Sequence, residues 1–517
     1  MSTAPAAAAG ARGGASARAH GRPFACLPRA RHVALVLLAA AMALVGVPSA
    51  HATTATPPPP AAARPLALPP LHEITLDNGL ATIVAARPGL PLVTVAIVLR
   101  AGAASDPPGR AGLAAATAAL LARGAQRGGR RVDAAALARQ AEALGASLDT
   151  AHGWHSVSVS MTVATPQLDA ALALLADVVR RPLLAANELA RWRLQALDDL
   201  DLARANPAAV AARVARRLHW GTSPYGAVTT PASLWRLTRD DVVAFHRRAA
   251  RPDRALLVLA GDVTPAQALA LARRHLGDWR APTRAAIADD APRPAAPMAV
   301  REAWVDMPGA GQSSVVVAAP WVALGDADLR VAQVAAAVLG GGYSARLNQQ
   351  VRIRRGLSYG VFADGEAFAG GGWWSATAQT DHATAAEVLR LIRDEVERLA
   401  RDAPQPGELA ARKAALVGGF ARAWETTAGI AALLAGHWAA DRPWGALAAY
   451  PDEIGAVTAE QVRDFAARRW PPQVLRAVVA GDLAAAGAAV PPPTEHTWRL
   501  PHTELDFDRA QLVAEPP

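Results

Sequence analysis

A long internal match is the feature that most constrains how this 517-residue chain can fold. Residues 238–262 and 458–482 align without a gap at one constant offset of 220 positions. A repeat of this length is typical of a duplicated domain rather than of a solenoid unit. We therefore expect two halves, each with its own core, facing each other about a pseudo-two-fold axis, with any ligand site between them. The matching positions are Thr238/Thr458, Val242/Val462, Phe245/Phe465, Arg248/Arg468, Pro252/Pro472, Val258/Val478 and the Ala-Gly-Asp triplets at 260–262 and 480–482.

The first 52 residues have the three parts of a secretory signal. Five arginines precede an apolar run from Val33 to Val47, and the small-residue sequence Ala50-His51-Ala52 follows it. This pattern predicts export, to the periplasm, with cleavage near Ala52. The run is shorter than the roughly 20 residues of a transmembrane helix. We expect no stable membrane span in the mature chain, and an uncleaved inner-membrane signal anchor is the alternative.

Cysteine usage and charge argue against thiol chemistry and against nucleic-acid binding. The single cysteine, Cys26, lies upstream of the apolar run and is lost with the signal. Removal of five arginines and of no acidic residue leaves 48 basic and 44 acidic residues, a net charge of +4. The sequence has no basic stripe with interleaved aromatic residues, which nucleic-acid binders carry. We therefore expect no nucleic-acid partner.

Changes in composition mark the domain boundaries. Two segments rich in alanine and proline favour extended structure, one before the first repeat and one between the two repeats. The predicted division is 1–52 signal peptide, 53–70 leader, 71–279 first domain, 280–297 linker, 298–490 second domain and 491–517 tail.

Local patterns in the first domain predict a sheet that begins with a hairpin. Asn78-Gly79 supplies the positive backbone angles of a tight turn between strands at His72–Leu76 and Leu80–Ala85. The unbroken apolar run Val93–Leu99 predicts a buried strand. Ser156–Val163 alternates between apolar and polar residues, which predicts a strand with one buried face.

Helix signals follow the strands in both halves. Thr165-Pro166 is typical of a helix start, and the helix is expected to run to about Arg180. In the second half Trp373–Gln379 is the predicted strand. Thr384-Ala385-Ala386-Glu387 then reads as a capping box that opens a helix to about Leu399. Each half is thus predicted to be an α+β sandwich of one mixed sheet and several helices.

Several motifs together resemble one family. The pattern V-x-x-F…P…V-x-A-G-D closes both halves, Ser223-Pro224-Tyr225-Gly226 lies in the first half, and the segment Leu339–Val361 lies in the second. These features resemble the M16 zinc metallopeptidases, the insulinase-, pitrilysin- and mitochondrial-processing-peptidase-like proteins, in their short two-domain form. The resemblance covers residues 66–490. It implies two homologous α+β domains in tandem that form half of a clamshell.

Active members of that family carry H-x-x-E-H on a helix, usually within a G-L-A-H-F-L-E-H run. Two histidines four residues apart lie on one helical face and bind zinc, while the glutamate activates water. In this chain Gly112-Leu113-Ala114 begins the run, but Ala115 and Ala119 stand at the histidine positions and Ala118 at the glutamate position. The resemblance therefore predicts that this chain binds no zinc and no other cofactor.

Nothing else in the sequence replaces the missing motif. No second H-x-x-E-H and no H-E-x-x-H occurs. His152 and His155 are the nearest approach to a ligand pair, and we interpret them as an incidental exposed pair. Asp198-Asp199 lies near the place of the family's third ligand but lacks a glutamate, and we interpret it as a solvated helix face.

The second half retains a different pair of residues. In active relatives an arginine and a tyrosine seven positions apart occupy the segment that here contains Arg352 and Tyr359. A tyrosine hydroxyl can donate to the oxyanion of a tetrahedral intermediate, and an arginine offers a planar fork of donors to substrate carbonyls. Gly356 is expected to end the helix that carries Arg352, with Tyr359 on the following strand. A surface arginine and a core tyrosine without function are the alternative.

A glycine run precedes this pair. Gly340, Gly341 and Gly342 lack the Gly-Lys-Ser/Thr that would complete a phosphate-binding loop. In the family this stretch allows a close loop, and a glycine-rich segment of some two-subunit relatives helps to hold substrate, so these glycines are candidate substrate-binding residues. Trp373 and Trp374 are expected to be core residues.

The resemblance implies a non-catalytic subunit of a heterodimeric M16 endopeptidase. The partner would be an H-x-x-E-H homologue that supplies zinc, and this chain would supply Arg352 and Tyr359 for the cleavage of short or unfolded peptides. A structural or peptide-binding protein without a peptidase role is the second hypothesis. A stand-alone metallopeptidase with unorthodox ligands is the third.

Overall fold

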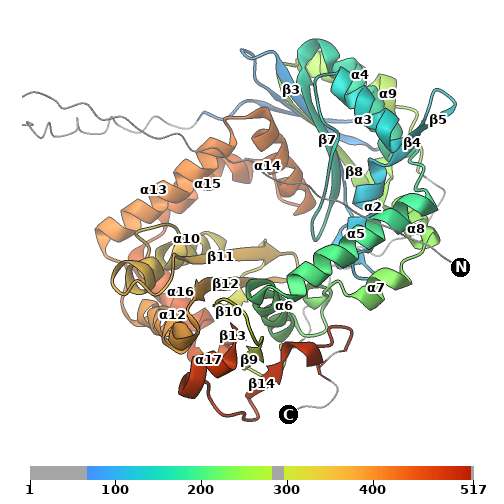
Figure 1. Cartoon of the computed structure of the whole chain (residues 1–517). Helices are drawn as coiled ribbons and strands as arrows, with labels where there is room; N and C mark the ends of the chain where they lie inside the picture. The colour runs from blue at the N-terminus through green and yellow to red at the C-terminus, as the bar shows by residue number, and fades with distance from the viewer. Residues whose placement is uncertain (1–66, 282–295, 510, 514–517) are drawn as a thin grey trace, which may run out of the picture. The chain divides into compact units, whose positions relative to one another are not determined.

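Two six-stranded sheets with the same internal arrangement form the framework of the computed structural model, which describes residues 67–281, 296–509 and 511–513 (Figure 1). In the first sheet the strand order is β1-β2-β8-β3-β7-β6. Its strands are β1 (Leu71–Thr75), β2 (Ala81–Ala86), β3 (Leu92–Leu99), β6 (Asp149–His152), β7 (Val157–Ala164) and β8 (Ala255–Gly261). A separate hairpin joins β4 (Gly124–Arg127) to β5 (Arg130–Asp133).

The second sheet repeats this layout in the second half of the chain. Its order is β11-β12-β10-β13-β9-β14. Its strands are β9 (Glu302–Asp306), β10 (Ser313–Trp321), β11 (Val361–Phe368), β12 (Gly371–Thr380), β13 (Arg476–Gly481) and β14 (Thr497–Pro501). One inner strand of each sheet has mixed pairing. This strand, β8 in the first sheet and β13 in the second, pairs parallel with one neighbour and antiparallel with the other. The outer strands differ, because β1 runs antiparallel to β2 whereas β14 runs parallel to β9.

The matching segments fold into the same elements at the same spacing. Helix α8 (Arg239–Ala249) corresponds to α16 (Ala459–Arg469), and each begins with a capping box, from Thr238 and Thr458. The glycines of the Ala-Gly-Asp triplets have a steric role. A Cβ on Gly261 would lie 2.1 Å from the Leu92 carbonyl oxygen, and one on Gly481 would lie 2.2 Å from the Ser313 hydroxyl. Only glycine fits where β8 and β13 pass so close to their neighbours.

One face of each sheet is covered by helices from the same half of the chain. In the first half these are α2 (Leu113–Leu121), α4 (Leu168–Arg180), α8 and α9 (Pro265–Leu276), with α3 (Ala134–Ala143), α5 (Ala186–Arg204) and α7 (Pro231–Arg236) outside them. In the second half α10 (Leu329–Gly340), α12 (Ala385–Arg401) and α16 form the corresponding layer. The remaining helices there are α11 (Arg346–Asn348), α13 (Pro406–Ala423), α15 (Gly445–Ala456) and α17 (Leu483–Ala486). Each half therefore buries a core of its own.

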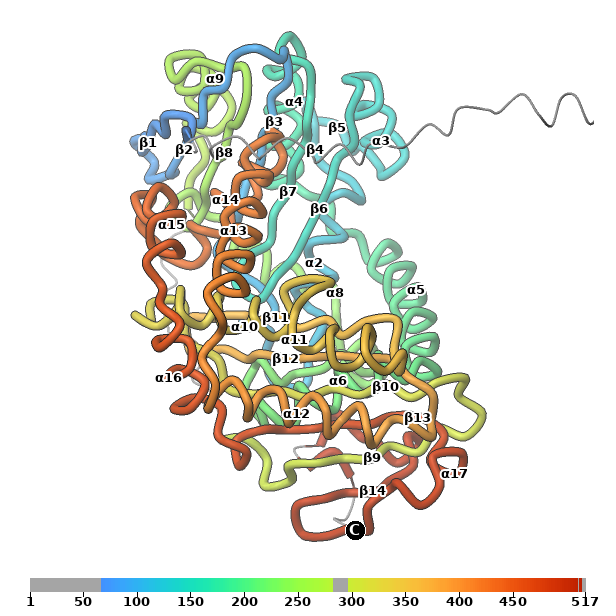
Figure 2. Tube along the Cα trace, turned by 90° about the vertical axis from the view of Figure 1, so that its left-hand side faces the viewer, coloured from blue at the N-terminus to red at the C-terminus, as the bar shows by residue number. Residues whose placement is uncertain are grey.

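The other face of each sheet is covered by a helix from the opposite half. Helix α6 (Pro207–Trp220) packs on β10 and β13, and α14 (Thr427–Ala439) packs on β3 and β8 (Figures 1 and 2). Val214 and Leu218 of α6 join the apolar cluster on the second sheet, while Ile430 and Leu434 of α14 join the cluster on the first. All four side chains are at most 1% exposed. Two further cores are thus shared between the halves.

Polar contacts fix these exchanged helices. The Arg100 guanidinium donates to the Trp438 carbonyl at 2.9 Å and lies 4.4 Å from the centre of the Trp438 ring. Thr94 donates to the Thr427 hydroxyl at 2.8 Å. On the other side Arg216 of α6 pairs with Glu366 of β11 at 3.3 Å. Hydrogen bonds to buried polar groups specify position more than they add net stability.

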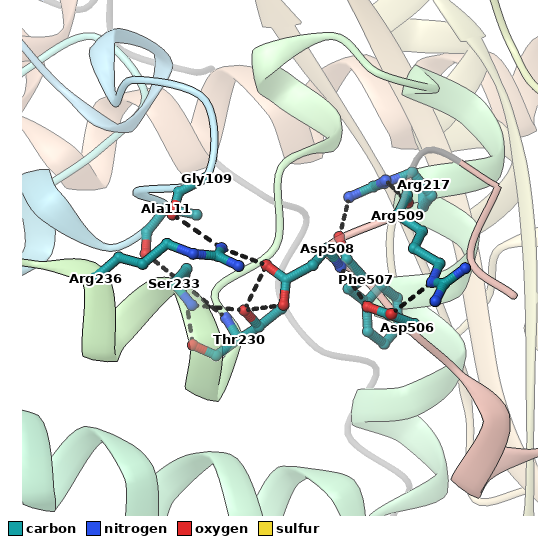
Figure 3. A network of polar contacts seen from close by, with 10 residues as sticks. All are labelled: Gly109, Ala111, Arg217, Thr230, Ser233, Arg236, Asp506, Phe507, Asp508 and Arg509. Atoms are coloured by element: carbon teal, nitrogen blue, oxygen red, sulfur yellow. Dashed lines mark hydrogen bonds and ion pairs between the residues drawn. The ribbon is translucent and has the colours of Figure 1, made fainter. Parts of the chain in front are cut away.

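The residues after β14 return to the first half. Arg217 of α6 donates to the carbonyls of Phe507 and Arg509, each at 2.7 Å, and Asp508 accepts from Thr230 at 2.9 Å (Figure 3). Arg236 adds an ion pair to Asp508 at 3.2 Å. Residues 497–509, within the segment expected to be a tail, therefore supply a strand of the second sheet and contacts to the first half.

Most of the local expectations are confirmed. The Asn78-Gly79 hairpin forms between β1 and β2, with Gly79 at φ +87°, and α4 ends at Arg180. The capping box at Thr384 is wrong. A 3-10 turn, His382–Thr384, precedes α12, and the Thr384 hydroxyl bonds to Thr380 and to the Asp381 carbonyl instead of to the helix.

The predicted signal peptide lies outside the described residues, as do most of the leader and of the linker between the halves. Among the helices that the structure describes, none combines the length and the apolar character that crossing a membrane requires.

The contact between α6 and the second sheet should weaken in mild acid. His219 of α6 is 6% exposed, and burial, together with nearby Arg476 and Arg216, lowers its pKa to about 4. An unfolded histidine titrates near 6.5, so the unfolded chain binds more protons between these values and stability falls as the pH falls. We expect a loss of about 2 kcal/mol from pH 7 to pH 5 from this group.

Urea denaturation at several pH values measures this effect. His219→Leu should flatten the dependence over this range, whereas His72→Leu, at an exposed position on β1, should leave it unchanged. An identical slope in wild type and His219→Leu would refute the assignment.

Candidate functional site

The segment that carries Arg352 is anchored by apolar neighbours. Helix α11 continues into one turn of π-helix, Gln349–Ile353, in which Val351 is fully buried and Arg352 is half-buried. Gly356 has φ +64°, and its N–H donates to the Arg352 carbonyl at 3.0 Å, so it ends the helix as expected. Leu347, also fully buried, fixes the other end of this short helix.

Tyr359 lies in the loop before β11, two residues ahead of the first strand residue, Val361. The expectation that it belongs to the strand itself is therefore wrong. The physical reason is local: Ser358 accepts from the Gly360 N–H at 3.2 Å and donates to the Gly360 carbonyl at 2.9 Å, which closes a small turn around Tyr359. The side chain of Tyr359 is 83% exposed, so it is not a core residue either.

The structure brings Arg352 and Tyr359 together. The guanidinium carbon of Arg352 lies 4.5 Å from the centre of the Tyr359 ring and 4.8 Å from that of Tyr343. Contacts of this kind contribute about 0.5–1 kcal/mol at exposed sites. Across the residues that the structure describes, no carboxylate pairs with Arg352. Its charge is thus held between two exposed aromatic rings and is open to a ligand.

Two buried polar side chains hold this arrangement in place. Asn348, 7% exposed, accepts from the Val361 N–H at 2.8 Å and donates to the carbonyls of Val361 and Gly342, each at 3.1 Å. Arg412 of α13, 6% exposed, donates to the Gly341 carbonyl at 2.8 Å and also bonds to Ser344. Sequence reasoning missed both residues. Asn348 lies inside the motif segment, but Arg412 is remote in sequence and nothing around it signals this role.

The three candidate glycines have clear structural roles. A Cβ on Gly340 would lie 2.3 Å from the Cβ of Ala363, so glycine is required where α10 packs on β11. Gly342 has φ +130°, which favours glycine, and it forms the turn between α10 and α11 together with exposed Gly341. These geometric reasons neither require nor exclude contact with a substrate.

A cavity of about 430 Å³ adjoins Tyr359. It is bounded by the loop 356–360, by the end of β12 and by Ala208 of α6. Phe362, 70% exposed, forms part of its wall, and Gln312, Gln379 and Asp381 give it hydrogen-bonding groups. A cavity with both apolar and polar lining residues can accept part of a peptide.

Helix α2 carries the three alanines at which the family resemblance predicted missing zinc ligands. Ala115 and Ala119 are half-buried, and Ala118 is 2% exposed. Asp106 accepts from the N–H groups of residues 112, 113 and 114 at 2.9, 3.1 and 2.9 Å, and burial raises the pKa of Asp106 to about 7. Methyl groups cannot bind zinc, so the residues present do not fit that metal.

The other candidate ligands are also accounted for. His155 was expected to be exposed, but it is half-buried. Its ring packs against Tyr225 and Phe368, and burial lowers its pKa. His152 and Asp198-Asp199 are exposed. Within the described part of the chain, no three His, Cys, Asp or Glu side chains are grouped as a metal site.

Comparison with known proteins defines the family. Residues 82–227 match the model "Insulinase (Peptidase family M16)", and residues 236–416 match "Peptidase M16 inactive domain". The chain therefore belongs to peptidase family M16, as its motifs predicted.

Curated relatives are described as zinc proteases without further characterisation. One from Mycobacterium tuberculosis is 28% identical over 286 residues, which is 55% of this chain and 65% of the relative. The matched part thus spans just under two thirds of the mycobacterial protein. One from Streptomyces coelicolor is 24% identical over 408 residues, 77% of this chain and 86% of the relative.

Solved structures share the fold at low sequence identity. The peptidase M16 inactive domain from Pseudomonas fluorescens has a TM-score of 0.72 and 24% identity and covers 80% of this chain and 98% of its own. A protease from Helicobacter pylori has a TM-score of 0.76 and 17% identity, with 80% of this chain and all of its own covered. A chain of complex III from Candida albicans has a TM-score of 0.67 and 15% identity over 80% of this chain.

The alanines of α2 lead to a prediction about the zinc content of the purified chain. The purified chain, incubated with zinc and then dialysed, should retain no stoichiometric metal, because thiolate, imidazole or carboxylate ligands are required and α2 offers none. Plasma mass spectrometry measures the metal content, and an H-x-x-E-H relative treated in parallel is the positive control. Retention of one zinc per chain that is lost in His152→Ala or His155→Ala would contradict this expectation.

Proposed function

We propose that this chain is the non-catalytic subunit of a heterodimeric M16 endopeptidase, to which it contributes Arg352 and Tyr359. The observation that carries the proposal is the contrast between the two halves. The second half presents an exposed tyrosine against an arginine that has no carboxylate partner among the described residues, whereas α2 in the first half has methyl groups at the positions of the zinc ligands. Half of a hydrolytic site is present, and the other half has to come from a second chain.

The chemistry of the pair suits peptide cleavage. A peptide carbonyl gains negative charge as water adds to it, and the Tyr359 hydroxyl, 83% exposed on its loop, is free to donate to that oxygen. Arg352 offers charge and a planar fork to the substrate backbone. The partner, an H-x-x-E-H homologue, would hold the zinc. The residues of α2 in this chain would take no part in the zinc chemistry.

The second sheet also offers a place for an extended substrate. β11 is an edge strand, Tyr359 precedes it by two residues, and its Phe362 lines the adjoining cavity. Peptides add to such edges through main-chain hydrogen bonds, which favours short or unfolded peptides over folded proteins. Gly341 and Gly342 are exposed, and we include these residues, with Gly340 as their support, in the proposed substrate contact. Export to the periplasm, cleavage near Ala52 and the absence of nucleic-acid partners remain part of this proposal.

Peptide hydrolysis by the assembled pair tests the proposal. The chain alone should be inactive with zinc present, and a mixture with a co-expressed H-x-x-E-H homologue should cleave unfolded peptides. Tyr359→Phe should lower kcat by about 10²-fold, the typical effect of losing one oxyanion donor. Tyr343→Phe removes the same hydroxyl from the other ring beside Arg352 and is the matched control, with little effect expected.

Three results would count against it. Activity of the lone chain with stoichiometric zinc would favour a stand-alone peptidase. A stable complex without activity would favour a structural or peptide-binding protein. An active complex in which Tyr359→Phe and Tyr343→Phe behave alike would remove Tyr359 from the mechanism.

A further inference from the structure

An open cavity of about 730 Å³ lies among four helices of the second half, and neither Arg352 nor Tyr359 lines it. Its walls come from α10, α13, α14 and α15, together with Leu324 in the loop after β10. Most of its lining is apolar, with Leu416, Phe420, Leu433 and Leu447 as the larger side chains. Cavities of this size with a mainly apolar lining and a few polar groups are typical small-molecule sites.

Small residues on facing helices create the space. They are Ala415, Gly419 and Ala423 of α13, Gly429, Ala432 and Gly436 of α14, Ala440 directly after α14, and Ala446 of α15. At Gly429 the two helices approach closely, because a Cβ there would lie 2.3 Å from the Ala423 carbonyl oxygen. Two turns further along α14, a Cβ on Gly436 would have no atom within 4 Å. The helices therefore meet at one end and leave a gap at the other.

The charge of the lining is positive. It contains Arg330 and Arg442 and no aspartate or glutamate. Arg330 is already paired with Glu453 at 2.6 Å and lies 4.7 Å from the centre of the Tyr450 ring. The side chain of Arg442 has no hydrogen-bond or ion-pair partner among the described residues, and the adjacent Asp441 pairs with Arg100 at 3.4 Å instead. Burial and the proximity of Arg330 lower the pKa of Arg442, while Glu453 acts in the opposite direction.

These properties select one class of ligand. A purely apolar molecule would fill the space beside the small residues but leave Arg442 unpaired. A small inorganic anion would pair with Arg442 but leave the apolar lining exposed to water. A molecule with both an anionic head and a flexible hydrocarbon chain satisfies the whole lining. We propose that this cavity binds a free single-chain fatty carboxylate, with the head group at Arg442 and the chain along α13 and α14. This site is independent of the proposed peptidase role.

Calorimetric titration with dodecanoate tests the proposal. The purified chain should bind one dodecanoate, and Gly436→Leu should weaken the affinity at least about tenfold, because the new side chain occupies the gap. Gly455→Leu is the matched control: this α15 position is exposed, has no atom within 4 Å of a Cβ and does not line the cavity. Leucine favours helices over glycine, so both variants should remain folded, which their melting temperatures verify.

The head group is tested separately. Arg442→Gln should weaken dodecanoate binding by about tenfold, the effect of losing a charged hydrogen bond, and should leave binding of 1-dodecanol unchanged. The proposal is wrong if dodecanoate does not bind, if Gly436→Leu and Gly455→Leu bind it equally, or if Arg442→Gln affects acid and alcohol alike. If dodecanoate does not bind and Gly436→Leu abolishes association with the partner chain, the cavity belongs to a protein interface instead.

Discussion

The exchange of α6 and α14 between the halves is the interaction on which the rest of the structure depends. Strands β3, β8, β10 and β13 are buried on both faces, and only one face of each sheet is covered by helices of the same half. A separated half would expose a whole apolar sheet face, far more than soluble proteins tolerate. The two halves are therefore one folding unit, and the expectation that each half buries its own core is correct for one face of each sheet only.

The packing of α6 on the second sheet also supports the candidate site. Because α6 fixes the second sheet to the first half, β11 and the loop before it have a rigid base, and Asn348 and Arg412 connect that base to the glycine turn. Arg352 and Tyr359 consequently stand at the surface with little freedom to collapse onto the core. Binding groups on a rigid support lose less entropy when a ligand binds.

Periodicity and motif spacing predicted much of the fold, and the failures have local causes. The Asn78-Gly79 turn and the repeated capping boxes depend on neighbours in sequence, and these features are visible without a structure. At Thr384 the hydroxyl bonds to Thr380 across a 3-10 turn, a contact that the capping pattern does not encode. His155 and Arg412 likewise gain their roles from residues more than fifty positions away, so no local pattern marks them. The Arg352 and Tyr359 pair was predictable only through the family resemblance.

The alanines of α2 are more than missing ligands, because the helix uses them for packing. Ala114 and Ala116 are fully buried and Ala118 is 2% exposed, so α2 lies against α8, β6 and β7 with no room for a carboxylate at residue 118. A glutamate there would place a charge in an apolar core, at a cost that only a metal or a paired cation offsets. The packing of α2 thus depends on small side chains at these positions.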